Sequence, residues 1–220
     1  VDLEGKKFVK MMDVPDCYHI FPTASDTFYM HCREGHLLKA TFDKEGNLKH
    51  EKTKALHPEN KYLVNTPAYS TKAKRLVWPS YDGTIYQVDL SGGDAKFLEP
   101  FEAFTEQEKA DKWAPGGWNL VAYHRESNRI YLLADQREQW THKYASRFVL
   151  VYDAATGKRI TKIDLGHDIN SIGVSADAEP QLYALSAHDR TLYIFDPATG
   201  KETSKVEQVG RVPLIVTTMD

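Results

Sequence analysis

The chain has 220 residues, of which 41% are hydrophobic, and its 28 Lys and Arg residues against 31 Asp and Glu residues give a formal net charge of −3. Because these charges are balanced and form no long block of one sign, we expect no binding to nucleic acid. No apolar run approaches the ~20 residues of a membrane-spanning helix, so we also expect no membrane insertion.

A short turn, in which an Asp precedes a Gly by three or four residues, occurs five times between strand-like runs. The turns are Asp2–Gly5, Asp43–Gly46, Asp89–Gly92, Asp153–Gly157 and Asp196–Gly200, and their aspartates follow one another at intervals of 41, 46, 64 and 43 residues. An Asp carboxylate accepts hydrogen bonds from backbone N–H groups two or three residues on, and Gly tolerates a left-handed backbone. A repeat of roughly 40 to 45 residues is typical of a β-propeller, in which each repeat forms one four-stranded blade. We therefore predict an all-β propeller fold with an insertion in the third interval.

The repeats divide the chain into about four blades of one partial propeller domain that covers residues 1–220. The predicted blades are 15–56, 62–101, 116–165 and 168–208, and residues 1–14 and 211–220 belong to flanking blades. We expect residues 1–6 to be the tail of a strand, with further blades upstream. We expect residues 211–219 to form one more inner or first strand, which has no partners of its own in this chain and closes the ring against the upstream portion. An open arc of blades would expose apolar sheet surface, so we do not expect these 220 residues to fold alone.

The first blade contains the two cysteines of the chain, Cys17 and Cys32, on what reads as a hairpin. If a two-residue loop at 24–25 joins the strands, Thr23 pairs with Asp26 and the two cysteines lie directly opposite each other. Opposed residues of a non-hydrogen-bonded pair have Cα atoms ~4.5 to 5.5 Å apart, which a disulfide can span. A disulfide would imply an oxidising compartment such as a periplasm, and two buried free thiols are the alternative.

The insertion in the third repeat has two pieces. The first begins at Thr105, and Glu108 three residues on completes a capping-box pattern, which predicts a short helix over 105–112. The helix runs into 113–119, where Pro-Gly-Gly separates Trp113 from Trp118. The second piece, 136–146, is predicted to be a loop between two strands and carries Trp140, His142 and Lys143. Loops at one rim of a rigid propeller are common partner-binding sites.

Four residues of the insertion are candidate interface residues: Trp113, Trp118, His142 and Lys143. Large aromatic faces on a tight backbone often anchor interfaces. The alternative, that these side chains simply pack between blades, stays open because propeller cores also consume tryptophans.

No catalytic or metal-binding motif stands out. The nine histidines show no His-x-x-x-His spacing, and the chain lacks a Cys-x-x-Cys pair, a Gly-x-Ser-x-Gly elbow and a Gly-rich phosphate loop. The Asp-x-x-Thr-Gly-Lys turns look superficially like the docking repeats of quinone-dependent alcohol dehydrogenases, but the Trp that ends those repeats is absent here. We therefore expect no catalytic residue, cofactor ligand or metal ligand in this chain.

Several longer runs resemble the heavy subunit of methylamine dehydrogenase, and the resemblance extends over essentially the whole chain. The runs are 17–23, 28–33, 75–79, 113–118 and 141–147. The large subunit of aromatic amine dehydrogenase shares the Trp-x-Pro-Gly-Gly and Thr-His-Lys elements less closely, so we favour the methylamine enzyme and keep its relative as an alternative.

This resemblance implies a seven-bladed propeller, of which the chain is roughly the C-terminal half, and a disulfide between Cys17 and Cys32. It also implies a periplasmic heterotetramer of two heavy and two light subunits, with the tryptophan tryptophylquinone cofactor in the light subunit. Such an enzyme converts a primary amine to an aldehyde and ammonia and passes electrons to the blue-copper protein amicyanin.

The implied role of the heavy subunit is to scaffold the light subunit, and the family residue that lines the substrate channel has no counterpart here. The hypothesis for the rim that meets the light subunit is Trp113, Trp118, His142 and Lys143. A non-enzymatic periplasmic propeller that binds proteins or ligands is the alternative from a different class. A lactonase-type propeller hydrolase would need a cluster of carboxylate or Asn metal ligands, and the sequence shows none.

Overall fold

The computed structural model describes residues 4–8, 11, 13–14 and 16–219. The chain forms two compact units, Val1–Glu59 and Asn60–Asp220, which are described here one at a time. The first of the five predicted turns begins at Asp2 and lies outside the described residues. None of the helices in the described part of the chain is long and apolar enough to cross a bilayer.

The first unit contains one antiparallel sheet whose strands follow one another in chain order. The strands are β1 (Cys17–Pro22), β2 (Thr27–Cys32), β3 (His36–Phe42) and β4 (Leu48–Ala55). The outer strand β4 is mostly charged and exposed, which protects a free sheet edge from pairing with other chains.

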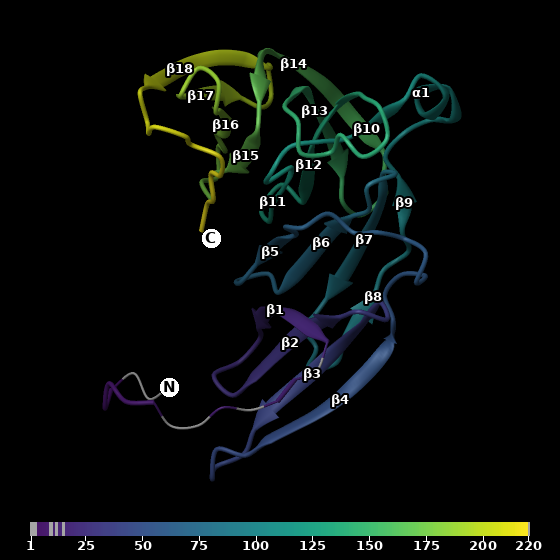
Figure 1. The fold of residues 1–220 in the computed structure, drawn as a ribbon, viewed down its shortest axis with the longest axis vertical. Helices are drawn as coiled ribbons and strands as arrows, with labels where there is room; N and C mark the ends of the chain where they lie inside the picture. Colours follow the sequence, from purple (N-terminus) through teal and green to yellow (C-terminus); the bar gives the residue numbers. More distant parts are fainter. Residues whose placement is uncertain (1–3, 9–10, 12, 15, 220) are drawn as a thin grey trace. The chain divides into compact units, whose positions relative to one another are not determined.

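The second unit contains three further antiparallel sheets (Figure 1). The second sheet consists of β5 (Ala68–Ser70), β6 (Arg75–Pro79) and β7 (Thr84–Asp89), with the short β8 (Lys96–Phe97) and β9 (Phe101–Glu102) both paired to β7. The third consists of β10 (Trp113–Pro115), β11 (Val121–His124), β12 (Arg129–Gln136), β13 (Ser146–Asp153) and β14 (Arg159–Ile169), and the fourth of β15 (Ser171–Val174), β16 (Leu182–Ser186), β17 (Thr191–Asp196) and β18 (Lys201–Glu207). The predicted all-β propeller fold is confirmed.

Within the second unit, β11 lies between β5 and β15, and the last strands β14 and β18 lie on the far side of their sheets (Figure 1). Asn119, two residues before β11, forms an isolated parallel bridge with Ser171 of β15. Gln87 of β7 donates its side-chain amide to the Ala154 carbonyl at 2.8 Å, and the Tyr152 hydroxyl donates to the Ala103 carbonyl at 2.7 Å. These bonds between neighbouring sheets satisfy polar groups that the packing of one sheet on the next removes from water.

The second strands of these sheets form the centre of the core. Residues 130–134 of β12 and 76–78 of β6 are fully buried on both faces. A strand covered on both faces has a continuous apolar run in place of an alternating pattern, as these sequences have. The Trp78 indole N–H is satisfied by the Val64 carbonyl at 2.6 Å.

The repeated turns have the predicted hydrogen bonds. The carboxylates of Asp43, Asp89, Asp153 and Asp196 each accept from a backbone N–H two residues on, at 2.8 to 3.1 Å. In one turn the predicted glycine is wrong. The glycine with a left-handed backbone after Asp89 is Gly93, with φ +86°, and not Gly92.

The cysteine hairpin combines a correct and an incorrect prediction. Cys17 lies opposite Cys32, and the two form a disulfide with Cα atoms 4.0 Å apart. At the other end of the hairpin, Thr23 donates its N–H to the Thr27 carbonyl, so the predicted pairing of Thr23 with residue 26 is wrong. A bulge between Tyr18 and Phe21 shifts the register by one residue and makes the loop longer.

The ends of the predicted elements differ in outcome. Helix α1 (Glu106–Ala110) begins at the Thr105 cap with both bonds of the capping box present, as predicted. Residues 211–219, expected to form a strand without partners of its own in this chain, are not assigned to a strand in the described part, and their closing of the ring stays a prediction. There the Val216 backbone is held by side chains instead, with its N–H on Ser171 Oγ at 2.9 Å and its carbonyl on Asn119 Nδ2 at 2.9 Å.

Candidate partner-binding site

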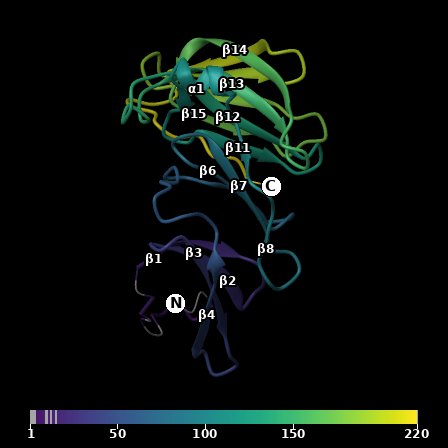
Figure 2. The ribbon, with the colours of Figure 1, turned by 90° about the vertical axis from the view of Figure 1, so that its right-hand side faces the viewer.

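The site is built from the two pieces of the insertion in the third sheet. Its first piece, α1, lies beside this sheet (Figure 2) and is fastened to it by an ion pair between Glu108 and Arg159 of β14. Arg159 Nη1 donates to Glu108 Oε1 at 2.5 Å, and the hydrogen bonds from Arg159 and Thr105 lower the pKa of Glu108 to about 2. The helix is therefore held in place by a charge-assisted contact at its first turn.

The Pro-Gly-Gly segment has a steric cause. A Cβ on Gly116 would collide with the Arg137 guanidinium, and a Cβ on Gly117 would lie 2.7 Å from the Asn170 carbonyl oxygen. Gly117 also has φ +132°, a conformation that side chains strongly disfavour. The two glycines let the chain pass between β12 and β15 at backbone contact distance.

The second piece is the loop 137–145 between β12 and β13, and Arg137 holds it together. The Arg137 Nη1 group donates to the Thr141 carbonyl at 2.7 Å, and Nη2 donates to Ser146 Oγ and to the Ala145 carbonyl, the latter at 3.3 Å. Ser146 Oγ in turn donates to the Gly116 carbonyl at 2.9 Å. The guanidinium thus ties the loop to the Pro-Gly-Gly segment.

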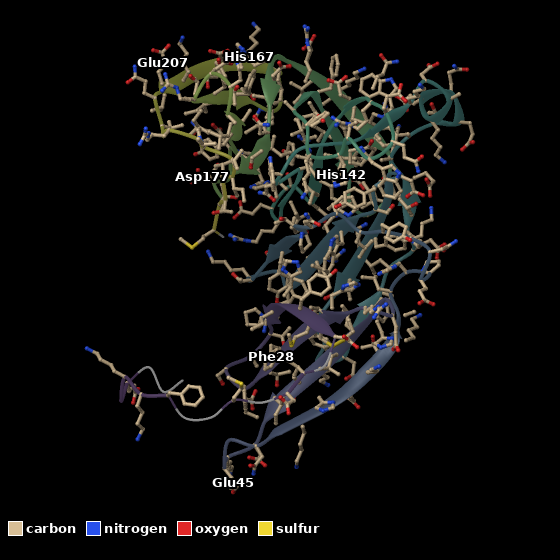
Figure 3. The ribbon with its side chains drawn as sticks, viewed as in Figure 1. Phe28, Glu45, His142, His167, Asp177 and Glu207 are labelled. Carbon is tan, nitrogen blue, oxygen red and sulfur yellow. A yellow bond between two sulfur atoms is a disulfide. The ribbon has the colours of Figure 1, made fainter. Side chains whose placement is uncertain are left out.

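The two pieces enclose a cleft of about 720 Å³ together with residues of the preceding sheet. Five of its lining residues carry aromatic rings: Tyr62, Tyr81, Trp113, Trp140 and His142. Tyr62 meets Trp140 edge-to-face with ring centroids 6.3 Å apart, and Tyr81 lies 4.1 Å from His142, which Figure 3 labels. Such ring pairs are well suited to burying the side chains of a partner.

The charges that line the cleft are largely paired. Lys61 pairs with Asp82, Lys109 Nζ lies 3.2 Å from a Glu102 oxygen, and Lys112 Nζ lies 2.6 Å from a Glu138 oxygen. Burial is the main cause that lowers the pKa of His142, and the neighbouring Lys143 and Arg137 charges lower it further. His142 is therefore a neutral ring at neutral pH.

The structure divides the four predicted interface residues into two pairs. Trp113 and His142 line the cleft, whereas Trp118 and Lys143 pair with each other beside it, with Lys143 Nζ 5.0 Å from the Trp118 ring centroid. The Gly117 N–H donates to the His142 carbonyl at 2.7 Å, which brings the two pairs close together in the fold.

The packing alternative holds in part for the tryptophans. The ring centroids of Trp113 and Phe148 lie 5.3 Å apart, and Lys162 Nζ lies 3.7 Å from the centroid of the Trp113 ring. The Trp118 backbone N–H donates to the Asn170 carbonyl at 2.6 Å. Both side chains remain partly exposed, so packing occupies only part of each ring.

Sequence reasoning missed Tyr62, Tyr81 and Arg137 as parts of this site. Both tyrosines belong to the preceding repeat, and nothing in the spacing of one repeat shows what the next repeat places against it. Arg137 lies within the predicted loop, where an Arg followed by Glu138 and Gln139 is indistinguishable from a solvated surface residue.

No group of three or more His, Cys, Asp and Glu side chains in the described ranges is placed to hold a metal ion. In the first unit, the rings of His31 and His57 meet with their Nε2 atoms 2.9 Å apart. Both rings are buried near β2, the strand that ends at Cys32, so two of the nine histidines have a role in packing.

The comparisons with known proteins give one family. The family model described as methylamine dehydrogenase heavy chain (MADH) matches residues 1–220. The chain is 61% identical over 220 residues to the methylamine dehydrogenase heavy chain of Methylorubrum extorquens, covering all of this chain and 54% of that protein. It is 57% identical to the heavy chain of Paracoccus versutus, covering all of this chain and 51% of that protein.

The chain spans about half the length of the curated relatives it matches. Among solved structures, that of apo AztD from Citrobacter koseri aligns with a TM-score of 0.58 at 16% identity, covering 99% of this chain and 54% of that one. A likeness at this identity shows a shared fold.

Proposed function

The chain belongs to the methylamine dehydrogenase heavy-chain family, and from this premise we propose that it serves as the large, non-catalytic subunit of a periplasmic methylamine dehydrogenase. The observation that carries the proposal is the match over all 220 residues at 61% identity to such a heavy chain. The disulfide between Cys17 and Cys32 supports an oxidising compartment such as the periplasm.

In this proposal, the heavy chain scaffolds a light subunit that carries tryptophan tryptophylquinone, in an assembly of two heavy and two light subunits. The complex oxidises a primary amine to an aldehyde and ammonia, with water as the oxygen source, and passes the two electrons one at a time to amicyanin. The residues of this chain supply no step of that reaction: they bind and orient the light subunit.

The tryptophans of this chain do not suit a quinone made from two joined tryptophan rings. Trp78 is fully buried with its N–H on a backbone carbonyl, and Trp113 packs on Phe148. Trp118 faces Lys143, and Trp140 meets the ring of Tyr62. This distribution supports a cofactor located in the partner subunit.

The light-subunit interface is proposed at the cleft and at the pair beside it. Trp113 and His142 line the cleft, and Trp118 with Lys143 extends the same surface. The partly exposed aromatic rings of this surface are of the kind that is enriched at subunit interfaces, and Lys143 would lie at the polar rim.

The first experiment is to isolate the protein natively from its source cell and to measure the intact-complex mass and the visible spectrum. We expect a longer heavy chain bound to a small, coloured, quinone-bearing subunit. A colourless monomer of 25.1 kDa that folds alone would contradict the proposal.

A second experiment locates the interface. Trp118→Ala and Lys143→Ala in the full heavy chain should each weaken assembly with the light subunit, because the two side chains contact each other and share one surface. Unchanged assembly in both variants, measured by size-exclusion chromatography, would remove this pair from the interface.

A further inference from the structure

Trp140 lies on the loop 137–145, and most of its side chain does not pack against the rest of the chain. Its side chain is 67% exposed, and its backbone is left-handed with φ +68°. A bulky residue rarely adopts this conformation, which is unfavourable and persists only where the surroundings impose it. The loop therefore holds a large apolar ring in solvent at a conformational cost.

The loop that presents Trp140 is compact and internally bonded. Thr141 Oγ1 donates to the Glu138 carbonyl at 2.6 Å, and the Tyr144 N–H donates to the Thr141 carbonyl at 3.0 Å. The Arg137 guanidinium fixes the same Thr141 carbonyl from the other side. Because these bonds preorganise the loop, a partner that covers Trp140 loses little further conformational entropy there.

Tyr62 completes an exposed apolar edge of the cleft. It is 64% exposed, and its ring meets Trp140 edge-to-face. Tyr62 precedes β5 while Trp140 follows β12, so two separate sheets contribute to this edge. Paired Trp and Tyr rings beside an Arg have the composition of interface hot spots.

One cation that lines the cleft, Arg137, has no carboxylate partner among the described residues. Each of the three lysines that line it has an acidic partner, whereas Arg137 bonds only to carbonyl and hydroxyl oxygens among the residues that the structure describes. Burial lowers the pKa of Arg137, and the nearby Asp135 charge opposes this effect without forming an ion pair. An incoming carboxylate would offset part of the cost of this partly buried cation.

We propose that Trp140 and Tyr62 are the anchor of the light-subunit interface, and that the light subunit places an apolar side chain against these rings and a neighbouring carboxylate at the cleft above Arg137. The inference rests on the proposed function, because the occupant it names is the light subunit. Arg137 is a positioning residue for Trp140 and supplies the positive charge.

The test uses the full-length heavy chain and its light subunit, with the dissociation constant measured by titration. Trp140→Ala should weaken binding by 30-fold or more, since buried aromatic anchors account for a large share of interface energy, and Trp140→Phe should restore part of it. Tyr144→Ala is the matched control: Tyr144 is 70% exposed on the same loop but does not line the cleft, so its removal should change binding less than threefold.

The charge is tested with Arg137→Lys and Arg137→Gln. Both variants lose the forked contacts of the loop, but only Arg137→Gln loses the charge. We expect Arg137→Gln to bind more weakly than Arg137→Lys and with a smaller dependence on salt concentration. Equal affinity and equal salt dependence of the two variants would overturn the carboxylate contact.

The outcomes separate this inference from the proposed function. If the wild-type heavy chain binds the light subunit and Trp140→Ala binds within threefold of it, the anchor is wrong while the proposed function stands. If the wild-type heavy chain does not bind the light subunit at all, the proposed function itself fails. Native-like circular dichroism of each variant shows that a loss of binding does not come from unfolding.

Discussion

The cysteine hairpin of the first unit and the insertion of the second unit both hold a loop rigidly, but by different means. In the hairpin, a covalent bond between Cys17 and Cys32 joins the ends of β1 and β2. In the insertion, hydrogen bonds of the Arg137 guanidinium and the close packing at two glycines hold the loop without a covalent bond. The stability of the first unit should therefore depend on redox conditions, whereas that of the second should depend on side-chain volume and charge.

The largest effect is expected from removing the covalent bond. Replacing Cys17 and Cys32 together by Ser should lower the free energy of unfolding of the first unit by about 3 kcal/mol, because the bond closes a loop with a sequence separation of 15. Urea denaturation of the full-length heavy chain measures this free energy for the double variant and for the wild type in its oxidised and reduced forms.

The second unit provides the control for that experiment, since it contains no cysteine. Its transition should stay in place on reduction. Equal shifts of both transitions would show that the two units unfold together and that the comparison between them does not hold thermodynamically.

The next effect concerns volume in the second unit. Gly117→Ala should destabilise the heavy chain by about 2 kcal/mol, because the new Cβ meets the Asn170 carbonyl and the backbone is left-handed at φ +132°. Gly92→Ala is the matched control, since no atom lies within 4 Å of its Cβ position and its φ is not positive. A cost for Gly92→Ala equal to that for Gly117→Ala would contradict the steric explanation.

A smaller effect is the pH dependence of the stability of the first unit, which contains His31. Burial first, and then the His57 charge, lowers the pKa of His31 from 6.5 to about 4 in the folded chain. The unfolded chain therefore binds a proton more readily, so the stability that comes from keeping this ring neutral is complete above pH 6.5 and is lost as the pH falls toward 4. We expect a loss of about 1–2 kcal/mol over this window, measured by urea denaturation at a series of pH values.

The variant His31→Gln should flatten the profile between pH 6.5 and 4, and His50→Gln, at an exposed position of β4, should leave it unchanged. A wild-type profile that is flat across this window would show that the His31 and His57 pair does not resist protonation.

The smallest effect belongs to the second unit at lower pH. Arg159 holds the folded pKa of Glu108 at about 2, below its ordinary value of 4.5, so the stabilisation is complete above pH 4.5 and is lost as the pH falls toward 2. Allowing for solvent screening, we expect about 1 kcal/mol. Glu108→Gln should remove this dependence, and a variant whose acid transition matches the wild type would exclude the ion pair as its cause.

Much of the fold was predictable because its signals are local. The turn aspartates bond to their own neighbours, and the capping box of Thr105 and Glu108 lies within one helical turn. The predicted opposition of Cys17 and Cys32 is also correct, but it came from a count that assumed a two-residue loop, and it holds because the bulge offsets the extra residue of the loop. Each of these interactions is complete within about 15 residues, so the sequence contains both partners in a fixed order.

The features that were mispredicted or missed depend on a third partner. The bulge between Tyr18 and Phe21 places His19 in a left-handed conformation with φ +56°, which no hairpin count foresees. The cleft needs Tyr62 and Tyr81 from one sheet and Trp140 from the next. The Pro-Gly-Gly segment was recognised as tight, but its cause, the approach of Arg137, is a contact across the sheet.

The complete burial of residues 76–78 in β6 and 130–134 in β12 has a consequence for hydrogen exchange. Because both faces of these strands are covered by neighbouring elements, no local opening can expose their amide protons to water without separating one sheet from the next. These amides should therefore exchange only through the largest opening events of the second unit, and at nearly equal rates in both strands. By contrast, the amides of the exposed strand β18 should exchange through small fluctuations at the sheet edge.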